Sequence, residues 1–117
     1  MAFCVSLYAK SQSSITNLIL LKEASKHIGE TVTLCGKVYQ ASLLSNVVNK
    51  PTLMNMGGST PNERVEVRIN FEDRANFSFN PEVLFLHKNI CFTGTISNKH
   101  GYTEIVVTKE NALKLFS

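Results

Sequence analysis

Two segments of the chain share one pattern, fifty-eight residues apart, and this repeat constrains the fold more than any other feature. Apolar and polar residues alternate in residues 30–38 and again in residues 88–96, and the two segments align apolar on apolar. A glycine interrupts each alternation at the same place, Gly36 in the first and Gly94 in the second. Alternation of period two indicates half-buried strands, and a glycine inside a strand typically marks a bulge or a sharp bend. Two strands that bend at matching positions favour a small closed barrel over a flat sandwich.

Three more segments are expected to complete the barrel. Residues 51–56 and 102–107 are candidates for the second and fifth strands, and residues 65–71 alternate cleanly enough to be the third. Alternate side chains of this third strand should face the core (Val65, Val67, Ile69 and Phe71) or face outward (Glu66, Arg68 and Asn70). Residues 98–101 end in a glycine, which suits a hairpin turn between the fourth and fifth strands.

The remaining segments are expected to be helical or irregular. Residues 22–28 fit two helical turns that end before Gly29. The stretch 72–86 breaks the alternation, and Pro81 is expected to open a helical turn there. Its apolar side chains predict a short helix or a plug at one end of the barrel: Phe77, Phe79, Val83, Leu84 and Phe85. Residues 111–116 are expected to form one more turn of helix. The sequence therefore predicts a mainly β fold, a five-stranded OB-fold barrel with a short N-terminal helix and a helical insert between strands three and four.

The order of these segments makes the chain similar to a known family. The residues that carry the resemblance are 29–38, 53–57 followed by Pro61 and Asn62, 65–71, 88–96 and 101–107, about two thirds of the chain. The chain resembles the small, stand-alone bacterial OB-fold proteins of the nucleic-acid-binding (tRNA anticodon-like) group, many of which are exported. The shared motifs are barrel glycines and alternating core positions, which are specific for architecture. The resemblance implies a barrel that binds a nucleic acid, an oligosaccharide or a protein strand on one face, with no chemistry of its own.

Length and composition fit a single folded domain. The chain has 117 residues, of which 44% are hydrophobic and 18% charged, and these values exclude a disordered chain. The net charge of +3 permits an anionic partner without demanding one. No apolar run in the sequence approaches the roughly 18 residues that a membrane-spanning helix needs. We interpret residues 15–117 as one OB-fold domain.

The first fourteen residues differ from the rest of the sequence. Residues 1–9 are mostly apolar and residues 10–14 are small and polar, an order typical of the second half of a secretory signal peptide, although a basic start is missing. The alternative is a flexible arm or an extra edge strand. A signal-peptide remnant predicts an exported protein, periplasmic or secreted, whereas an arm predicts a cytoplasmic one.

Candidate binding residues follow from the way OB-fold barrels bind. The ligand usually lies across the outer face of strands two and three, between the loop that joins strands one and two and the loop that joins strands four and five. Alternation and turn placement put eight candidates on or beside that face: Lys37, Tyr39, Asn55, Arg68, Asn70, Lys99, His100 and Tyr102. The cations would contact the phosphates of a single-stranded nucleic acid, and the tyrosines would stack on its bases.

Each candidate also has a purely structural interpretation. Arg68 could form a cross-strand ion pair, Asn55 could hold a turn before Gly57, and the two tyrosines could cover the rim of the barrel. Lys37, Lys99 and His100 could be ordinary surface residues. Glu66 faces outward beside Arg68 and would repel phosphate.

The functional prediction is a binding protein without catalytic activity. No carboxylate cluster for a divalent cation and no nucleophile–base arrangement can be found in the order of residues, so we expect neither an enzyme nor a cofactor. Single-stranded nucleic acid is the expected ligand. The alternative is an exported module that binds a protein or an oligosaccharide, with a protein partner added along an edge strand.

The three cysteines do not indicate a metal site, because they form no pair at the spacing of zinc ligands. Cys35 and Cys91 should point outward from strands one and four, which are neighbours in an OB-fold barrel. A disulfide would need a register that brings their Cα atoms within about 7 Å. We expect free thiols at both positions.

Overall fold

The computed structural model describes residues 18–43, 50–57, 64–109 and 113–116, the last four by their backbone. The elements are the 3₁₀-helix η1 (Leu21–Lys26), the strands β1 (Thr31–Leu43), β2 (Thr52–Gly57) and β3 (Arg64–Ile69), the helices α2 (Phe71–Arg74) and α3 (Pro81–Leu84), and the strands β4 (Asn89–Ser97), β5 (Glu104–Val106) and β6 (Leu113–Phe116). The interpretation of residues 1–14 lies outside the described residues. Among the residues described, no helix is long and apolar enough to span a membrane.

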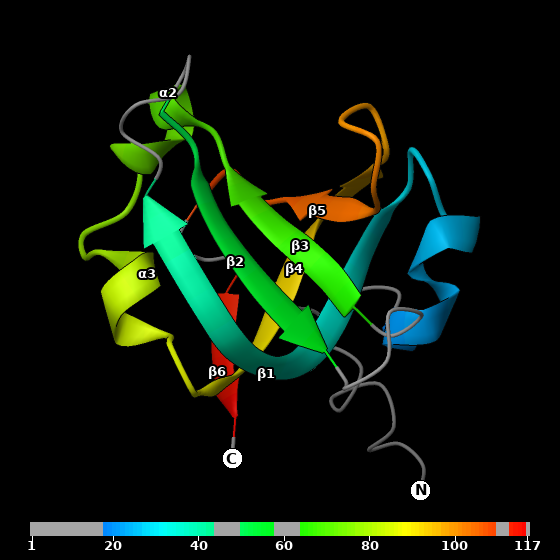
Figure 1. The fold of residues 1–117 in the computed structure, drawn as a ribbon, viewed down its shortest axis with the longest axis horizontal. Coiled ribbons are helices and arrows are strands. Elements are labelled where there is room, and N and C mark those ends of the chain that lie inside the picture. The colour runs from blue at the N-terminus through cyan, green and yellow to red at the C-terminus, as the bar shows by residue number, and fades with distance from the viewer. Residues whose placement is uncertain (1–17, 44–49, 58–63, 110–112, 117) are drawn as a thin grey trace, which may run out of the picture.

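Five of the strands close into a barrel. Neighbours pair in the order β1-β2-β3-β5-β4, and an antiparallel pairing of β1 with β4 joins the two ends of that order. β3 and β5 run parallel, whereas β2 is antiparallel to both of its neighbours. In Figure 1, β1 is the long curved strand that pairs with β4 along its first half and with β2 along its second half. The predicted five-stranded barrel is confirmed.

The core consists of the side chains that alternation places inside. Members from β1 to β5 with almost no exposed surface are Val32, Leu34, Val38, Met54, Met56, Val65, Val67, Ile69, Ile90, Phe92, Ile96 and Ile105. Each fully buried side chain of this kind contributes roughly 1.5–3 kcal/mol. Phe71 was wrongly predicted to join them. β3 ends at Ile69, so Phe71 begins α2 instead and is 55% exposed, with the Lys50 ammonium group 5.8 Å from its ring centre.

The two matching glycines allow the close approach of different segments. Gly94 lies opposite Val32, and a Cβ atom there would come within 2.2 Å of the Val106 carbonyl oxygen. A side chain at this position would therefore push β5 away from β4. At Gly36 the nearest atom to such a Cβ belongs to the Leu21 side chain, at 3.1 Å, so this glycine makes room for the segment at η1.

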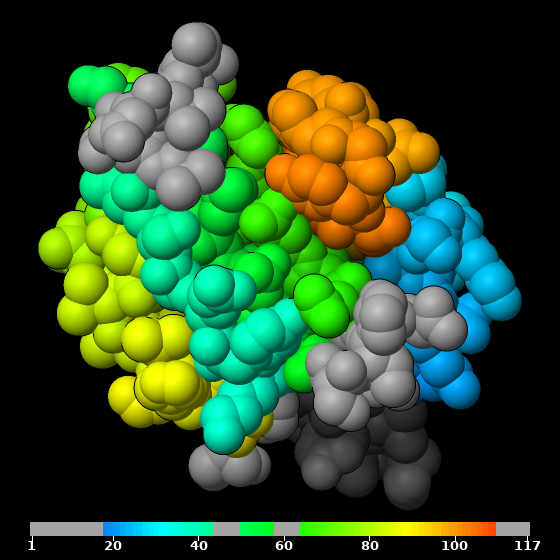
Figure 2. All heavy atoms as spheres, viewed as in Figure 1, coloured from blue at the N-terminus to red at the C-terminus, as the bar shows by residue number. Residues whose placement is uncertain are grey.

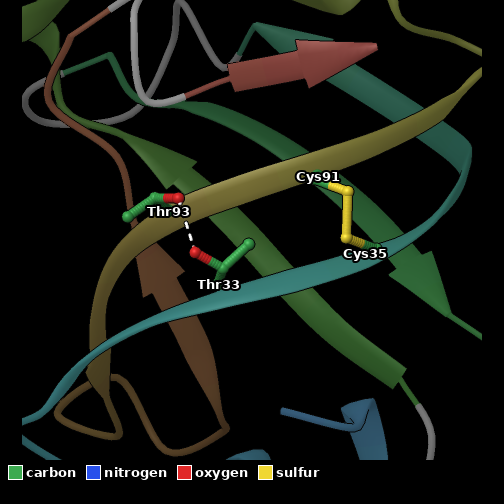
Figure 3. Close-up of a disulfide and its surroundings, with 4 residues drawn as sticks. All are labelled: Thr33, Cys35, Cys91 and Thr93. Carbon is green, nitrogen blue, oxygen red and sulfur yellow. Dashed lines mark hydrogen bonds between the residues drawn. A yellow bond between two sulfur atoms is a disulfide. The ribbon is translucent and has the colours of Figure 1, made fainter. Parts of the chain in front are cut away.

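Cys35 and Cys91 form a disulfide, so the expectation of free thiols was wrong. The register of β1 and β4 sets the two cysteines directly opposite each other, just as it sets Thr33 opposite Thr93. Both pairs lie on the side of the two strands that faces away from the core residues, and the threonine hydroxyls hydrogen-bond at 2.7 Å (Figure 3). A covalent bond and a hydrogen bond thus hold the same pair of strands together.

The insert between β3 and β4 covers one side of the barrel. Figure 1 shows α2 and α3 on the side away from η1. Phe77 and Phe85 are buried, and the ring of Phe79 lies edge-on to both of them, as a plug requires. Val83 and Leu84 lie in the predicted short helix, α3, but they do not help to close the barrel, because 71% and 48% of their surface is exposed.

Arg74 attaches the insert to the barrel. Its guanidinium group donates hydrogen bonds to the side chains of Thr52 on β2, Asn80 and Glu82. Burial alone would raise the pKa of Glu82, but the hydrogen bond and positive charge of Arg74 outweigh burial and lower that pKa. Pro81 occupies the first turn of α3, as predicted.

The ends of the chain differ from the predicted elements. Residues 113–116 form β6, not a helical turn; residues 111 and 112 lie outside the described residues. β1 pairs with one edge of β4, and β5 covers the other edge only at residues 95–97, so β6 pairs with that edge at residues 89–92. An isolated turn of helix would have been marginal by comparison. In place of the two helical turns expected at residues 22–28, the chain forms the shorter 3₁₀-helix η1, and Gly29 follows it with a φ of 87°.

The disulfide can be tested by counting thiols. A Cys4→Ser chain, denatured without reductant, should show no thiol that reacts with a chromogenic reagent, and two after reduction. Replacing both Cys35 and Cys91 with serine should lower the free energy of unfolding by up to about 4 kcal/mol, the chain-entropy value for a separation of 56 residues. Reactive thiols in the unreduced Cys4→Ser chain would contradict the bridge.

Candidate functional site

A row of polar side chains crosses the outer face of the barrel. Gln40 on β1 lies opposite Asn55 on β2, Asn55 opposite Glu66 on β3, and Glu66 opposite Glu104 on β5. Alternation produces this row, because the residues on either side of Asn55 and Glu66 point into the core. The Asn55 Nδ2 atom donates a hydrogen bond to Gln40 Oε1 at 3.0 Å.

A hollow of about 420 Å³ lies over this row. Its lining comes from β2, β3 and the segment after the β4–β5 turn: Asn55, Arg64, Val65, Glu66, Tyr102 and Thr103. Figure 2 shows the face as spheres, with the orange turn beside the green strands β2 and β3. This is the part of the barrel surface where the sequence placed the binding face.

Tyr102 and Glu66, which both line the hollow, are in direct polar contact. Burial, together with the hydrogen bond that the Tyr102 hydroxyl donates to the Glu66 carboxylate, raises the pKa of Tyr102 from 10.0 to about 12. The tyrosine is nevertheless 43% exposed. The hydroxyl is therefore anchored while the side chain remains accessible from solvent.

Glu104 attaches the β4–β5 turn to the barrel wall. Its carboxylate is completely buried, with His100 Nδ1 hydrogen-bonded to Oε1 and the Arg68 guanidinium group 3.9 Å from Oε2. Among the residues that the structure describes, Oε2 itself has no hydrogen-bond partner. Arg68 Nε donates to Asn70 Oδ1 at 2.8 Å. A buried carboxylate is destabilising without such partners, so the main role of Arg68 and His100 is to stabilise the Glu104 carboxylate.

The structure brings some of the predicted site residues together and separates others. Asn55 and Tyr102 line the hollow, and Lys99 and His100 lie on the adjoining turn. Arg68 does form an ion pair across strands, and Asn55 is part of β2 and not of a turn. Lys37 instead lines a separate groove.

That groove measures about 980 Å³ and is lined mostly by apolar residues, from residues 18–23, His27, residues 35–37 and Gly57. Tyr39 lines neither hollow and is 36% exposed on β1.

Sequence reasoning missed four members of the face. Gln40 lies beyond the predicted end of the first strand, and Arg64 lies before the predicted start of the third. Thr103 follows Tyr102 directly, so alternation placed it on the inward side. Glu66 was predicted to face outward but was weighed only as a repulsive charge. In the part of the chain that the structure describes, no three His, Cys, Asp or Glu side chains gather closely enough to hold a metal ion.

Comparisons with known proteins bear on the fold. Neither a protein-family model nor a curated protein sequence matches the chain. Among solved structures, the OB domain of a Methanosarcina mazei protein superposes with a TM-score of 0.62 at 14% identity, over 86% of this chain and 84% of that one. The barrel is an OB-fold.

Other OB-fold similarities extend across larger proteins. A chain of the S. pombe Stn1–Ten1 complex matches with a TM-score of 0.56 and 9% identity, over 74% of this chain and 57% of the other. A chain described as an aspartyl-tRNA synthetase of Leishmania major matches with a TM-score of 0.57 and 12% identity, over 86% of this chain. The match spans only 20% of that synthetase.

The contact between Tyr102 and Glu66 can be tested by titrating the phenol. The folded chain holds the phenolic proton more tightly than the unfolded chain, so this group stabilises the fold fully below pH 10, and that stabilisation is lost as the pH rises toward about 12. In Glu66→Gln, tyrosinate absorbance should show the Tyr102 midpoint shifted down toward 10.

Tyr102→Phe is the control for this titration, since it should remove the absorbance step near pH 12 altogether. A step that persists in Tyr102→Phe, or a midpoint that Glu66→Gln leaves unchanged, would show that the two side chains do not interact.

Proposed function

We propose that this OB-fold protein binds single-stranded nucleic acid across the outer face of β2 and β3, without catalysing a reaction. The observation that carries the proposal is the hollow over the polar row, where an accessible tyrosine and an exposed arginine lie on the face that OB-fold barrels use for binding. An aromatic ring can stack on a base, and a cation beside it can contact the adjacent phosphate.

The arrangement of charges indicates which cations serve the phosphates. Arg68 has only 12% of its side chain exposed and is held by Glu104 and Asn70, so it is a poor phosphate ligand. Arg64 is exposed at the start of β3, and Lys99 is exposed on the β4–β5 turn. We therefore assign the phosphate contacts to Arg64, which lines the hollow, and to Lys99 on the adjoining turn.

The similar structures support the proposed function at the level of the fold alone. One of them is named as an aspartyl-tRNA synthetase, a protein whose name gives tRNA as its substrate. The Stn1–Ten1 complex, by its name, joins two proteins. The two names thus concern a protein that acts on tRNA and a complex of two proteins.

The second candidate is an exported module that binds a protein or an oligosaccharide. The Cys35–Cys91 disulfide favours it, because such bonds persist mainly in oxidising compartments. A solved OBody bound to hen egg-white lysozyme matches this chain with a TM-score of 0.55 and 13% identity, over 85% of this chain and 92% of that one. Within the described residues β6 pairs only with β4, so its other edge could accept a partner strand.

Binding of nucleic acid should depend on salt through two identified cations. We expect fluorescence anisotropy to show a labelled single-stranded oligonucleotide binding with an affinity that falls log-linearly with salt concentration. Arg64→Ala and Lys99→Ala should each weaken binding and reduce the salt slope by about one unit, because each removes one phosphate contact.

Lys26→Ala is the matched control for loss of charge. Lys26 lies on η1 and is paired with Glu23 at 3.1 Å, away from the residues that line the hollow. Its substitution should leave the slope unchanged. Absence of binding even at low salt would refute the nucleic-acid proposal and favour the protein or oligosaccharide ligand.

A further inference from the structure

Two polar side chains that line the hollow, Asn55 and Glu66, offer hydrogen-bond acceptors. Asn55 Nδ2 donates to Gln40 Oε1, which turns the Asn55 carbonyl oxygen away from that contact. The ionised Glu66 carboxylate accepts hydrogen bonds and donates none. The Tyr102 hydroxyl already donates its one proton to that carboxylate. A ligand that satisfies Asn55 and Glu66 must therefore bring donors of its own.

The carboxylate also keeps phosphate away from its part of the hollow. Glu66 lies opposite Glu104 across β3 and β5, so two acidic residues occupy neighbouring positions on this face. A phosphate placed over Glu66 would be repelled, whereas Arg64 provides a favourable position for it. Glu66 is thus suited to contact a base, and Arg64 to contact the phosphate backbone.

We propose that the hollow binds a guanine base in preference to the other bases, with Glu66 as the residue that determines specificity. The proposal rests on the proposed function and identifies the base that this same site selects. Of the common bases, only guanine carries two adjacent donors, N1–H and the N2 amino group, on its Watson–Crick edge. These two donors match the two oxygens of one carboxylate, and bases in single strands are commonly recognised along this edge.

Tyr102 and Asn55 complete the site around that base. The tyrosine side chain is held in place by its hydroxyl bond to Glu66, so the stacking surface and the carboxylate are positioned together. Asn55 lies directly opposite Glu66 and adds a further acceptor beside the donor edge. The volume of about 420 Å³ lies within the range of roughly 300–1,000 Å³ that small-ligand sites have.

The test compares short labelled oligonucleotides that differ at one base. The probes are an oligothymidine, the same strand with one central guanine, and the same strand with inosine at that place, which lacks the N2 amino group. We expect the guanine strand to bind about tenfold more tightly than the oligothymidine, a ratio within reach of one bidentate base contact. The inosine strand should have an intermediate affinity.

Glu66→Gln should abolish the preference for guanine while the oligothymidine still binds, because the amide offers one acceptor and one donor in place of two acceptors. Glu72→Gln is the matched control, since Glu72 is exposed on α2 and does not line the hollow. It removes the same charge and should leave the preference intact. Unfolding curves of both variants establish that each remains folded.

The outcomes separate this inference from the function on which it rests. If no strand binds to the unaltered protein, both are wrong. If the strands bind with equal affinity, or if Glu66→Gln keeps the preference, nucleic-acid binding stands and the guanine site is wrong. An arginine-rich peptide also presents paired donors; if it binds through Glu66 while no oligonucleotide does, the hollow belongs to a protein ligand.

Discussion

β1 pairs with β4 from Thr31 to Lys37 and then turns away to pair with β2, and this change of partner closes the barrel. The disulfide lies within the paired segment of β1 and β4, and Gly94 on β4 allows β5 to approach β4 closely. With β4 fixed between β1 and β5, the turn that follows it must emerge beside β3. The position of Tyr102 over the outer face is thus a consequence of how the barrel closes.

Electrostatics on that face divide the charged residues into two groups. Glu104 is buried and needs Arg68 and His100 as partners, so these three hold the turn against the barrel and are of limited use to a ligand. Arg64 and Glu66 remain accessible beside the hollow. A ligand in the hollow therefore meets one accessible cation and one accessible carboxylate.

Periodicity in the sequence was sufficient to predict the five strands and, with the exception of Phe71, the side chains that the third strand contributes to the core. It could not predict the disulfide, because alternation determines the side on which Cys35 and Cys91 lie but not which residues stand opposite each other. The exposure of Phe71 depended on β3 ending two residues earlier, and β6 depended on an open edge of β4. These are properties of tertiary pairing.

The candidate site was predictable to a similar extent. Asn55 and Tyr102 could be placed from parity and the hairpin turn, and both line the hollow. The cross-strand ion pair of Arg68 was foreseen as an alternative, but its partner was not, because Glu104 becomes buried only when β5 pairs with β3. The most direct measurement is a map of amide chemical shifts during titration with a short single-stranded DNA at low salt. The account predicts changes centred on Asn55, Glu66 and Tyr102; changes confined to η1 and the groove beside it would contradict it.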